Sequence, residues 1–166
     1  MESRAVTFSG QGFSLRGEKG RFVLPPEFRK AVRESGGGER VLCLGKHPRW
    51  KCLTGFGLSR ADDFEAELDR EERGALDRGQ DFDRDQRAHQ LYGFASVPFD
   101  DSGRFILPDR HVRLGGIDDC AFFQGGGRFF TIWSPAELAR MPSGWEDAQE
   151  ACADLQAQAR NGKGGK

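Results

Sequence analysis

The sequence predicts a β-rich α+β protein built from two copies of one small structural motif. The first observation is an internal repeat, because residues 18–25 read EKGRFVLP and residues 101–108 read DSGRFILP, 83 positions later. The second is that a helix-like segment and two apolar, strand-like segments follow each copy. The third is a charged stretch between the copies whose sparse apolar residues are typical of an exposed helical connection.

Each copy of the repeat predicts a turn, a strand and the start of a helix. An acidic residue and a glycine favour a tight turn, an arginine and apolar residues then form a short strand, and proline stops it. Proline also suits the first turn of a helix, so we expect short helices over residues 27–32 and 110–114. The glycines at 36–38 and 115–116 predict where these helices end.

Two more strands are predicted after each helix. Residues 41–44 and 120–123 are apolar runs, and residues 50–53 and 128–133 are the closing strands. Helix starts follow at Ser59 and at Ser134-Pro135, so each half runs strand, strand, helix, strand, strand, helix. The connection over residues 59–90 is predicted to be helical, with a break near Gly74 or Gly79.

Composition gives no sign of a membrane protein or an enzyme. No apolar run has the length of a signal peptide or a membrane span, so we expect a cytoplasmic protein without membrane contact whose four cysteines are reduced. Walker, G-x-S-x-G and H-E-x-x-H patterns are absent from the sequence. Cys43, His47 and Cys52 form the one Cys/His cluster, but their spacing is not that of a zinc site. We therefore predict no catalytic residues, no metal and no cofactor.

Charge is uneven along the chain although its formal net charge is only −1. Between residues 16 and 33, six cations face two acids, so this segment carries a charge of plus four. The connection over residues 60–87 instead interleaves acids with arginines, as solvated helical faces do. Any binding to nucleic acid must therefore come from local charge rather than from the net charge of the chain.

The paired motifs resemble those of the MraZ family of transcriptional regulators, whose members carry two AbrB-like (SpoVT-AbrB) halves in one chain. The resemblance covers residues 8–145 and rests on several segments: Phe8-Ser9-Gly10 before Lys19-Gly20-Arg21, both Gly-Arg-apolar-Leu-Pro cores, residues 87–95 ending Tyr92-Gly93-Phe94-Ala95, and Ile132-Trp133. It implies a tandem, pseudo-symmetric, swapped-hairpin AbrB-like barrel with connecting and C-terminal helices.

The domain organisation expected on this basis has five parts. They are a first AbrB-like half over residues 8–56, a helical connection over 57–92, a second AbrB-like half over 93–134, a C-terminal helix over 135–160, and a disordered tail over 161–166.

The resemblance also implies a function. It predicts a non-enzymatic, sequence-specific DNA-binding regulator, acting as a repressor on the division and cell-wall gene cluster. Such a protein binds repeated promoter sites in double-stranded DNA as a closed ring of identical subunits, within the cytoplasm and associated with the nucleoid. Several weak contacts on spaced repeats then add up through avidity, which reconciles the low net charge with DNA binding.

Five residues are the candidate DNA contacts. Lys19 and Arg21 are the principal ones, because a turn can present two cations to phosphates and a guanidinium to a guanine edge. Arg29, Lys30 and Arg104 are supporting candidates. The alternative interpretation is that the motif arginines pair with nearby carboxylates and that the helix cations are ordinary solvated charges.

Departures from the family pattern make the two copies unequal. The family places Asp four residues before the motif arginine; Asp100 keeps it before Arg104, whereas Gly17 stands before Arg21. Arg104, flanked by acids, is therefore predicted to be the more structural arginine. Gly17 also motivates a second hypothesis, a ring-forming interaction protein without specific DNA recognition. A small hydrolase or metal enzyme, suggested only by His47, the cysteines and the acids, is the third.

Overall fold

The computed structural model describes residues 6–164, and its elements repeat in the predicted order. The first half contains β1 (Gln11–Leu15), β2 (Arg21–Val23), α1 (Pro26–Ser35), β3 (Val41–Lys46) and β4 (Leu53–Phe56), followed by α2 (Phe64–Asp77) and α3 (Arg84–Tyr92). The second half contains β5 (Ala95–Pro98), β6 (Arg104–Ile106), α4 (Asp109–Gly115), β7 (Cys120–Gly125) and β8 (Phe130–Trp133), followed by α5 (Pro135–Ala139) and α6 (Glu146–Gly164). Short 3-10 helices cover Glu18–Gly20 and Leu58–Asp63.

The predicted helix boundaries are set by the residues that suggested them. Gly36 is the C-cap of α1, and Gly116, with φ of +62°, is the left-handed C-cap of α4. The break in the connection falls at Gly79, whose φ is +66°, and not at Gly74, which stays inside α2. Asp83 then caps α3, because its carboxylate accepts a hydrogen bond from the Gln86 amide at 3.0 Å.

Several boundaries differ from the prediction. The second closing strand starts at Phe130 rather than Arg128, and the C-terminal helix expected over 135–160 is divided into α5 and α6. The first closing strand starts at Leu53 rather than Trp50, because His47 Nδ1 accepts hydrogen bonds from the Arg49 and Trp50 amides, both at 3.1 Å, and lengthens the turn. The C-terminal helix extends through Gly164, so residues 161–164 of the expected disordered tail are helical, and 165–166 lie outside the described residues.

The main sheet is open and does not close into the AbrB-like barrel that the resemblance implied. Its six antiparallel strands have the order β1-β7-β8-β4-β3-β5, which places β1 and β5 at opposite edges where they do not pair. Strands β2 and β6 pair only with each other and form a separate two-stranded ribbon. Helices cover both faces of the sheet, so its apolar side chains are buried without closure.

The two halves are interlocked by their strand pairing. Strand β1 of the first half pairs with β7 of the second, and β5 of the second half pairs with β3 of the first. Strands β4 and β8 join the halves at the centre of the sheet, and β2 pairs with β6 across the halves. Neither half therefore has a complete sheet of its own.

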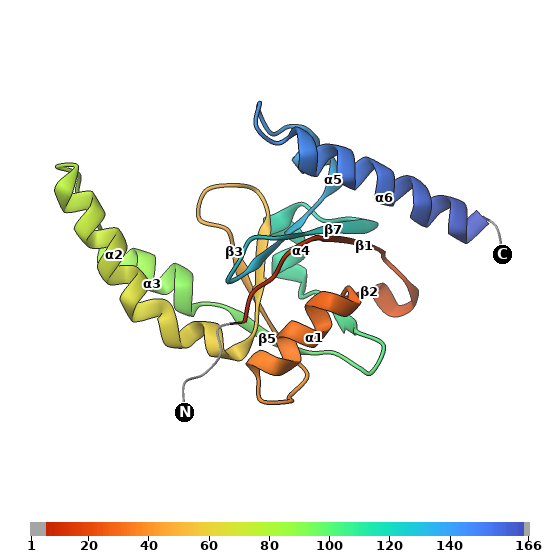
Figure 1. Cartoon of the computed structure of the whole chain (residues 1–166), viewed down its shortest axis with the longest axis horizontal. Helices are drawn as coiled ribbons and strands as arrows, with labels where there is room; N and C mark the ends of the chain where they lie inside the picture. Colours follow the sequence, from red (N-terminus) through yellow and green to blue (C-terminus); the bar gives the residue numbers. More distant parts are fainter. Residues whose placement is uncertain (1–5, 165–166) are drawn as a thin grey trace.

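Three apolar clusters lie around the sheet. The largest, with Phe28 from α1 and Phe105 from β6, contains residues of both halves on one face. On the other face, Trp133 and Phe122 pack with α5 and α6, and Phe56 and Phe64 pack with residues of α3. Figure 1 shows the result: α2 and α3 project from one end of the molecule, and α6 lies across the sheet and extends past the other end.

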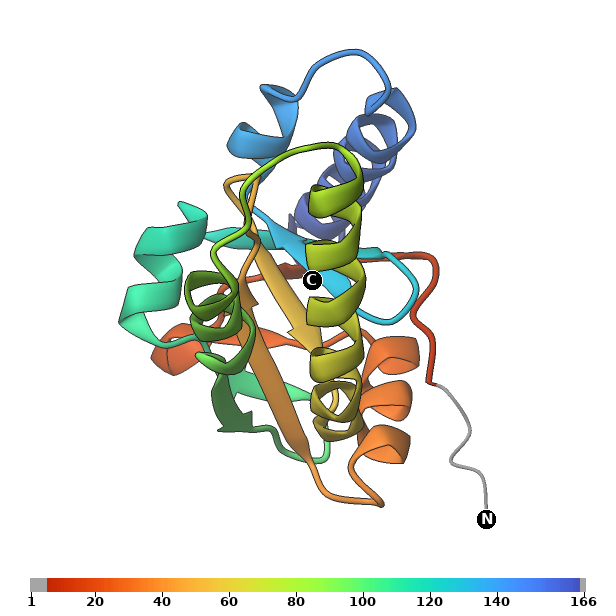
Figure 2. The same ribbon diagram turned by 90° about the vertical axis from the view of Figure 1, so that its left-hand side faces the viewer.

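The turned view shows the layers from the end that carries the helical hairpin. Helix α2 stands beside the sheet, with α1 next to its base, while α4 lies on the opposite side (Figure 2). The β2–β6 ribbon and its two turns are thus far from the tip of the α2–α3 hairpin (Figure 1).

Candidate nucleic-acid interface

The β2–β6 ribbon sorts its side chains onto two faces. Arg21 pairs with Ile106, Phe22 with Phe105, and Val23 with Arg104. Because strand side chains alternate, Phe22 and Phe105 enter the core, with ring centroids 6.3 Å apart, while the other four residues face outward. Val23 and Ile106 keep 39% and 59% of their surface exposed, so the two motif arginines stand on an outer face with two apolar neighbours.

The two turns that enter this ribbon share a backbone hydrogen bond and a left-handed glycine. Gly17 donates its amide hydrogen bond to the Arg21 carbonyl at 2.7 Å, and Asp100 donates to the Arg104 carbonyl at 3.1 Å. Gly20 and Gly103 adopt φ of +69° and +83°, a region that favours glycine. The sequence repeat is therefore largely a repeat of structure, although the backbone at Lys19 is left-handed and that at the matching Ser102 is not.

The second turn neutralises its own arginine. One Asp100 oxygen accepts from Arg104 Nε at 2.7 Å, and the other accepts from the Ser102 and Arg104 amides at 3.0 and 2.9 Å. Chiefly through the Arg104 amide, these bonds hold the pKa of Asp100 below its ordinary value. The adjacent Asp101 forms an ion pair with Arg40. Arg104 therefore offers little uncompensated charge, as its flanking acids predicted.

The first turn keeps its positive charge. Arg21 Nε donates only to a backbone carbonyl, that of Glu18, at 3.3 Å, and Arg16 donates to the Gly20 and Asp118 carbonyls, both at 3.4 Å. Lys19 is exposed and has φ of +60°, which is unusual for a residue with a side chain. Within residues 6–164, none of these three cations lies within ion-pair distance of a carboxylate.

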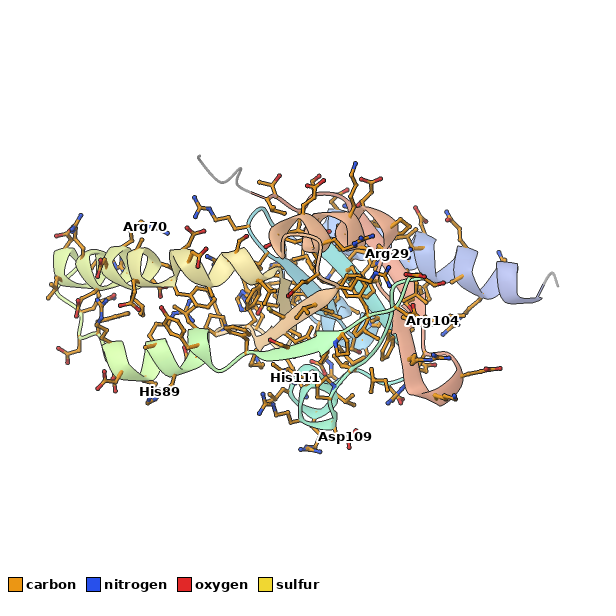
Figure 3. All side chains as sticks on the ribbon, turned by 90° about the horizontal axis from the view of Figure 1, so that it is seen from below. Arg29, Arg70, His89, Arg104, Asp109 and His111 are labelled. Atoms are coloured by element: carbon orange, nitrogen blue, oxygen red, sulfur yellow. The ribbon has the colours of Figure 1, made fainter. Side chains whose placement is uncertain are left out.

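Arg29 on α1 reaches across to the second turn. Its Nη2 donates to the Leu24 carbonyl at 3.0 Å, and its Nη1 lies 3.5 Å from the Asp101 carbonyl oxygen. The guanidinium also packs on Gly103 so closely that a Cβ there would lie 2.4 Å from Arg29 Nε. Arg29 therefore joins the two copies of the motif, and Figure 3 shows it on the same side as Arg104, away from Arg70 and His89 on the hairpin helices.

The structure thus places Arg21 and Arg104 on the outer face of the ribbon and Arg29 against the second turn, while Lys19 lies in the first turn, at the other end of the ribbon. Lys30 is exposed on α1, where it lines a shallow depression of about 620 Å³ with Arg29, Arg33 and Asp101. Arg40 was missed, since nothing in its own neighbourhood in the sequence indicates a partner at Asp101. The sequence indicated that Arg16 belongs to the basic segment but not that it contacts Gly20. It also did not indicate that Val23 and Ile106 are exposed.

Similarity to known proteins identifies the family to which this chain belongs. No protein-family profile matches the chain. The chain is 35% identical over 136 residues to the transcriptional regulator MraZ of Parvibaculum lavamentivorans, covering 80% of this chain and 79% of that protein. It is 34% identical over 124 residues to the MraZ of Gluconacetobacter diazotrophicus (74% and 75% covered), and 32% identical over 146 residues to that of Caulobacter vibrioides (87% and 88%). The chain belongs to the MraZ family.

The two turns of this MraZ chain are asymmetric. A carboxylate stands four residues before the motif arginine in the second copy, where Asp100 binds Arg104, and Gly17 takes that position in the first copy. The two motif arginines of this MraZ chain are therefore in different electrostatic states, one neutralised and one open.

None of the helices within residues 6–164 combines the length and apolar content that a membrane span needs. In the same part of the chain, no three His, Cys, Asp or Glu side chains gather in a way that could hold a metal ion.

Proposed function

We propose that this MraZ chain is a sequence-specific DNA-binding transcription regulator and that its first motif copy makes the principal DNA contacts. The observation that carries the proposal is the contrast between the two turns: Lys19 and Arg21 have no carboxylate partner among the described residues, whereas Arg104 is bound by Asp100. A cation without a partner releases counterions from DNA when it meets a phosphate, but a neutralised one does not.

Arg21 and Lys19 are suited to different parts of the duplex. Arg21 points outward from an antiparallel ribbon, and such ribbons fit into the major groove, where a guanidinium can bind both acceptors of a guanine. Lys19 at the tip of the turn suits a phosphate oxygen. Lys30 and Arg33 extend the positive charge along α1, while Arg29 and Arg104 position the second turn.

We further propose that identical subunits form a closed ring on repeated promoter sites ahead of division and cell-wall genes, as a repressor in the cytoplasm and nucleoid. In this proposal residues 8–56 and 93–134 are the paired AbrB-like halves, residues 57–92 connect them, and the chain has no catalytic role. A few phosphate contacts per subunit bind weakly, so assembly on spaced repeats supplies the avidity that one subunit lacks.

Fluorescence anisotropy with the duplex upstream of the chain's own gene tests DNA binding. We compare wild type with Lys19→Ala plus Arg21→Ala, and use Arg73→Ala plus Arg78→Ala, on exposed positions of the hairpin, as a control with the same charge change. We expect the first variant to bind DNA more weakly. The slope of the logarithm of the binding constant against the logarithm of salt concentration should become shallower by about 0.9 for each phosphate contact that is lost, and the control should behave like wild type. Equal behaviour of all three proteins would overturn the proposal.

Native mass spectrometry, and competition with random DNA, test the remaining parts. A closed ring that prefers repeated sites over random DNA of equal length is the expected result. Intact rings without that preference would instead support the interaction protein that Gly17 motivates.

A further inference from the structure

A pocket separate from the ribbon lies between the sheet and the helical hairpin. Its volume is about 440 Å³, within the range of small-molecule sites. The β3–β4 hairpin forms one wall, and α2 and α3 form the other. Apolar side chains, among them Phe56, Leu91 and Phe129, line part of it, and basic side chains line much of the rest.

The charge of this pocket is opposite to that of the segment that builds it. Residues 58–92 hold eleven carboxylates and six arginines, so the connection is acidic. The pocket lining instead holds four cations, Lys46, Arg60, Arg70 and Arg87, against two carboxylates, Glu67 and Glu71. A positive pocket within an acidic segment favours an anion of small size over a large acidic or basic surface.

Arg60 is a largely buried cation in this lining, and its hydrogen bonding is incomplete. Only 10% of it is exposed, its Nη2 lies 2.7 Å from a Glu67 oxygen without hydrogen-bond alignment, and its Nε and Nη1 have no acceptor among the described residues. The Phe64 and Phe129 rings flank it, with centroids 5.3 and 5.9 Å from its Cζ. Buried guanidinium N–H groups usually have acceptors, so Arg60 is a charged group with unfilled hydrogen-bonding capacity beside the pocket.

His47 adds an uncharged donor at the same pocket. Its Nδ1 accepts hydrogen bonds from the Arg49 and Trp50 amides, which leaves the proton on Nε2. Burial, followed by the nearby Lys46 charge, lowers the pKa of His47 to about 4, so the ring is neutral near pH 7. Arg87 is mostly committed to Glu71, its Nε lying 2.8 Å from Oε1, and Lys46 donates to two carbonyls. Arg60, His47 and the exposed Arg70, which has no hydrogen bond or ion pair among the described residues, are thus the donors with spare capacity.

We propose that this pocket binds a small aromatic carboxylate, with the carboxylate on Arg60 and the ring against the apolar side chains. The ligand anion would take over the place of Glu67 at the guanidinium, so Glu67 competes with the ligand. The proposal is independent of the DNA interface, because none of Lys19, Arg21, Arg29, Lys30 and Arg104 lines this pocket.

Isothermal titration calorimetry of the full-length protein with benzoate, in the absence of DNA, tests the site. Benzamide, which has the same shape without charge, is the matched ligand. We expect one benzoate per chain, bound about tenfold more tightly than benzamide, because a charge-assisted bond to a guanidinium requires the anion. Benzoate that binds no better than benzamide, or not at all, would overturn the proposal.

Variants of the pocket separate the site from general effects on folding. Arg60→Gln should weaken benzoate binding about tenfold, and Glu67→Gln should strengthen it severalfold by removing the competing carboxylate. The gain in Glu67→Gln keeps the test decisive if Arg60→Gln fails to fold. Arg128→Gln, which breaks an exposed ion pair with Asp63 outside the pocket, should bind like wild type.

Two further outcomes distinguish this site from its surroundings. Lys19→Ala plus Arg21→Ala should bind benzoate normally even where it no longer binds DNA, so failure of one proposal does not imply failure of the other. Benzoate binding that disappears as the chain assembles into oligomers would show that a second copy fills the pocket, and would overturn the proposal.

Discussion

Gly17 and Asp100 make the same backbone hydrogen bond to the carbonyl of the motif arginine, yet only Asp100 also binds that arginine's side chain. At these two positions the backbone bond is the same and the side-chain carboxylate is the difference. In this chain the first turn lacks it and carries Lys19, while the second has it and an additional ion pair through Asp101.

Gly17→Asp tests whether the open charge of Arg21 matters. Gly17 has extended backbone with φ of −94°, and a Cβ there would lie no closer than 3.6 Å to the Arg21 carbonyl oxygen, so we expect stability to change by less than about 0.5 kcal/mol. The new carboxylate should bind Arg21. The slope of the logarithm of the DNA-binding constant against the logarithm of salt concentration should then become shallower by about 0.9. An unchanged affinity at every salt concentration would show that Arg21 does not meet phosphate or base.

Lys19→Gly should change stability and DNA binding in opposite directions. The left-handed backbone at Lys19 strains any residue with a Cβ, so glycine should raise the free energy of unfolding by about 0.5–1 kcal/mol. Loss of the ammonium should weaken DNA binding. The control is Lys30→Gly within α1, which should lower stability by about 1 kcal/mol. Urea denaturation of both variants gives the comparison.

Gly103→Ala tests the close contact between the second turn and Arg29 on α1. The methyl group meets Arg29 at 2.4 Å and the backbone has φ of +83°, so we expect a loss of about 2 kcal/mol. Gly37→Ala is the matched control, because its φ is +65° but its Cβ would meet open space. A loss that is equal in the two variants would mean that backbone strain alone is responsible and that Arg29 gives way without cost.

Stability should fall as the pH drops below neutral. Burial lowers the pKa of His47 to about 4, and burial also lowers the pKa of His111. Below neutral pH the unfolded chain therefore binds more protons than the folded chain, which favours unfolding. The loss for His47 begins near its ordinary value of 6.5 and is complete below about pH 4. Unfolding by urea at pH 7.5 and at pH 5 should show a smaller difference in His47→Gln than in wild type.

His89→Gln is the control for the pH experiment, because its side chain is exposed on α3. It should keep the pH dependence of wild type. A His47→Gln variant that is as sensitive to pH as wild type would assign the effect to His111 or to the carboxylates.

The repeat allowed much of the local structure to be predicted from sequence. Turn, strand, proline and helix follow one another through backbone preferences of a few residues, so β2, β6, α1 and α4 lie where the motif placed them. The closing strand at Leu53 was displaced by a side chain, His47, which bonds to the backbone of its own turn. Such bonds depend on the folded geometry and leave no periodic pattern.

Contacts between segments distant in the sequence were harder to predict. No sequence pattern shows that β1 pairs with β7, or that the sheet remains open, because both depend on which apolar faces meet. At the interface, the charges of Lys19 and Arg21 were predictable as a local cluster. The ion pair of Arg40 with Asp101 and the reach of Arg29 to Gly103 were not, since each joins residues distant in the chain.

The pairing of strands between the two halves also limits when the chain can fold during its synthesis. A ribosome makes the first motif copy early, but β2 has no partner until β6 has emerged, and β1 has none until β7 has emerged. Pairing between segments so distant in sequence is slow, and the apolar strands of the nascent chain stay unpaired in the meantime. A chain truncated after its first half would therefore present Lys19 and Arg21 on a single strand, without the ribbon that orients them.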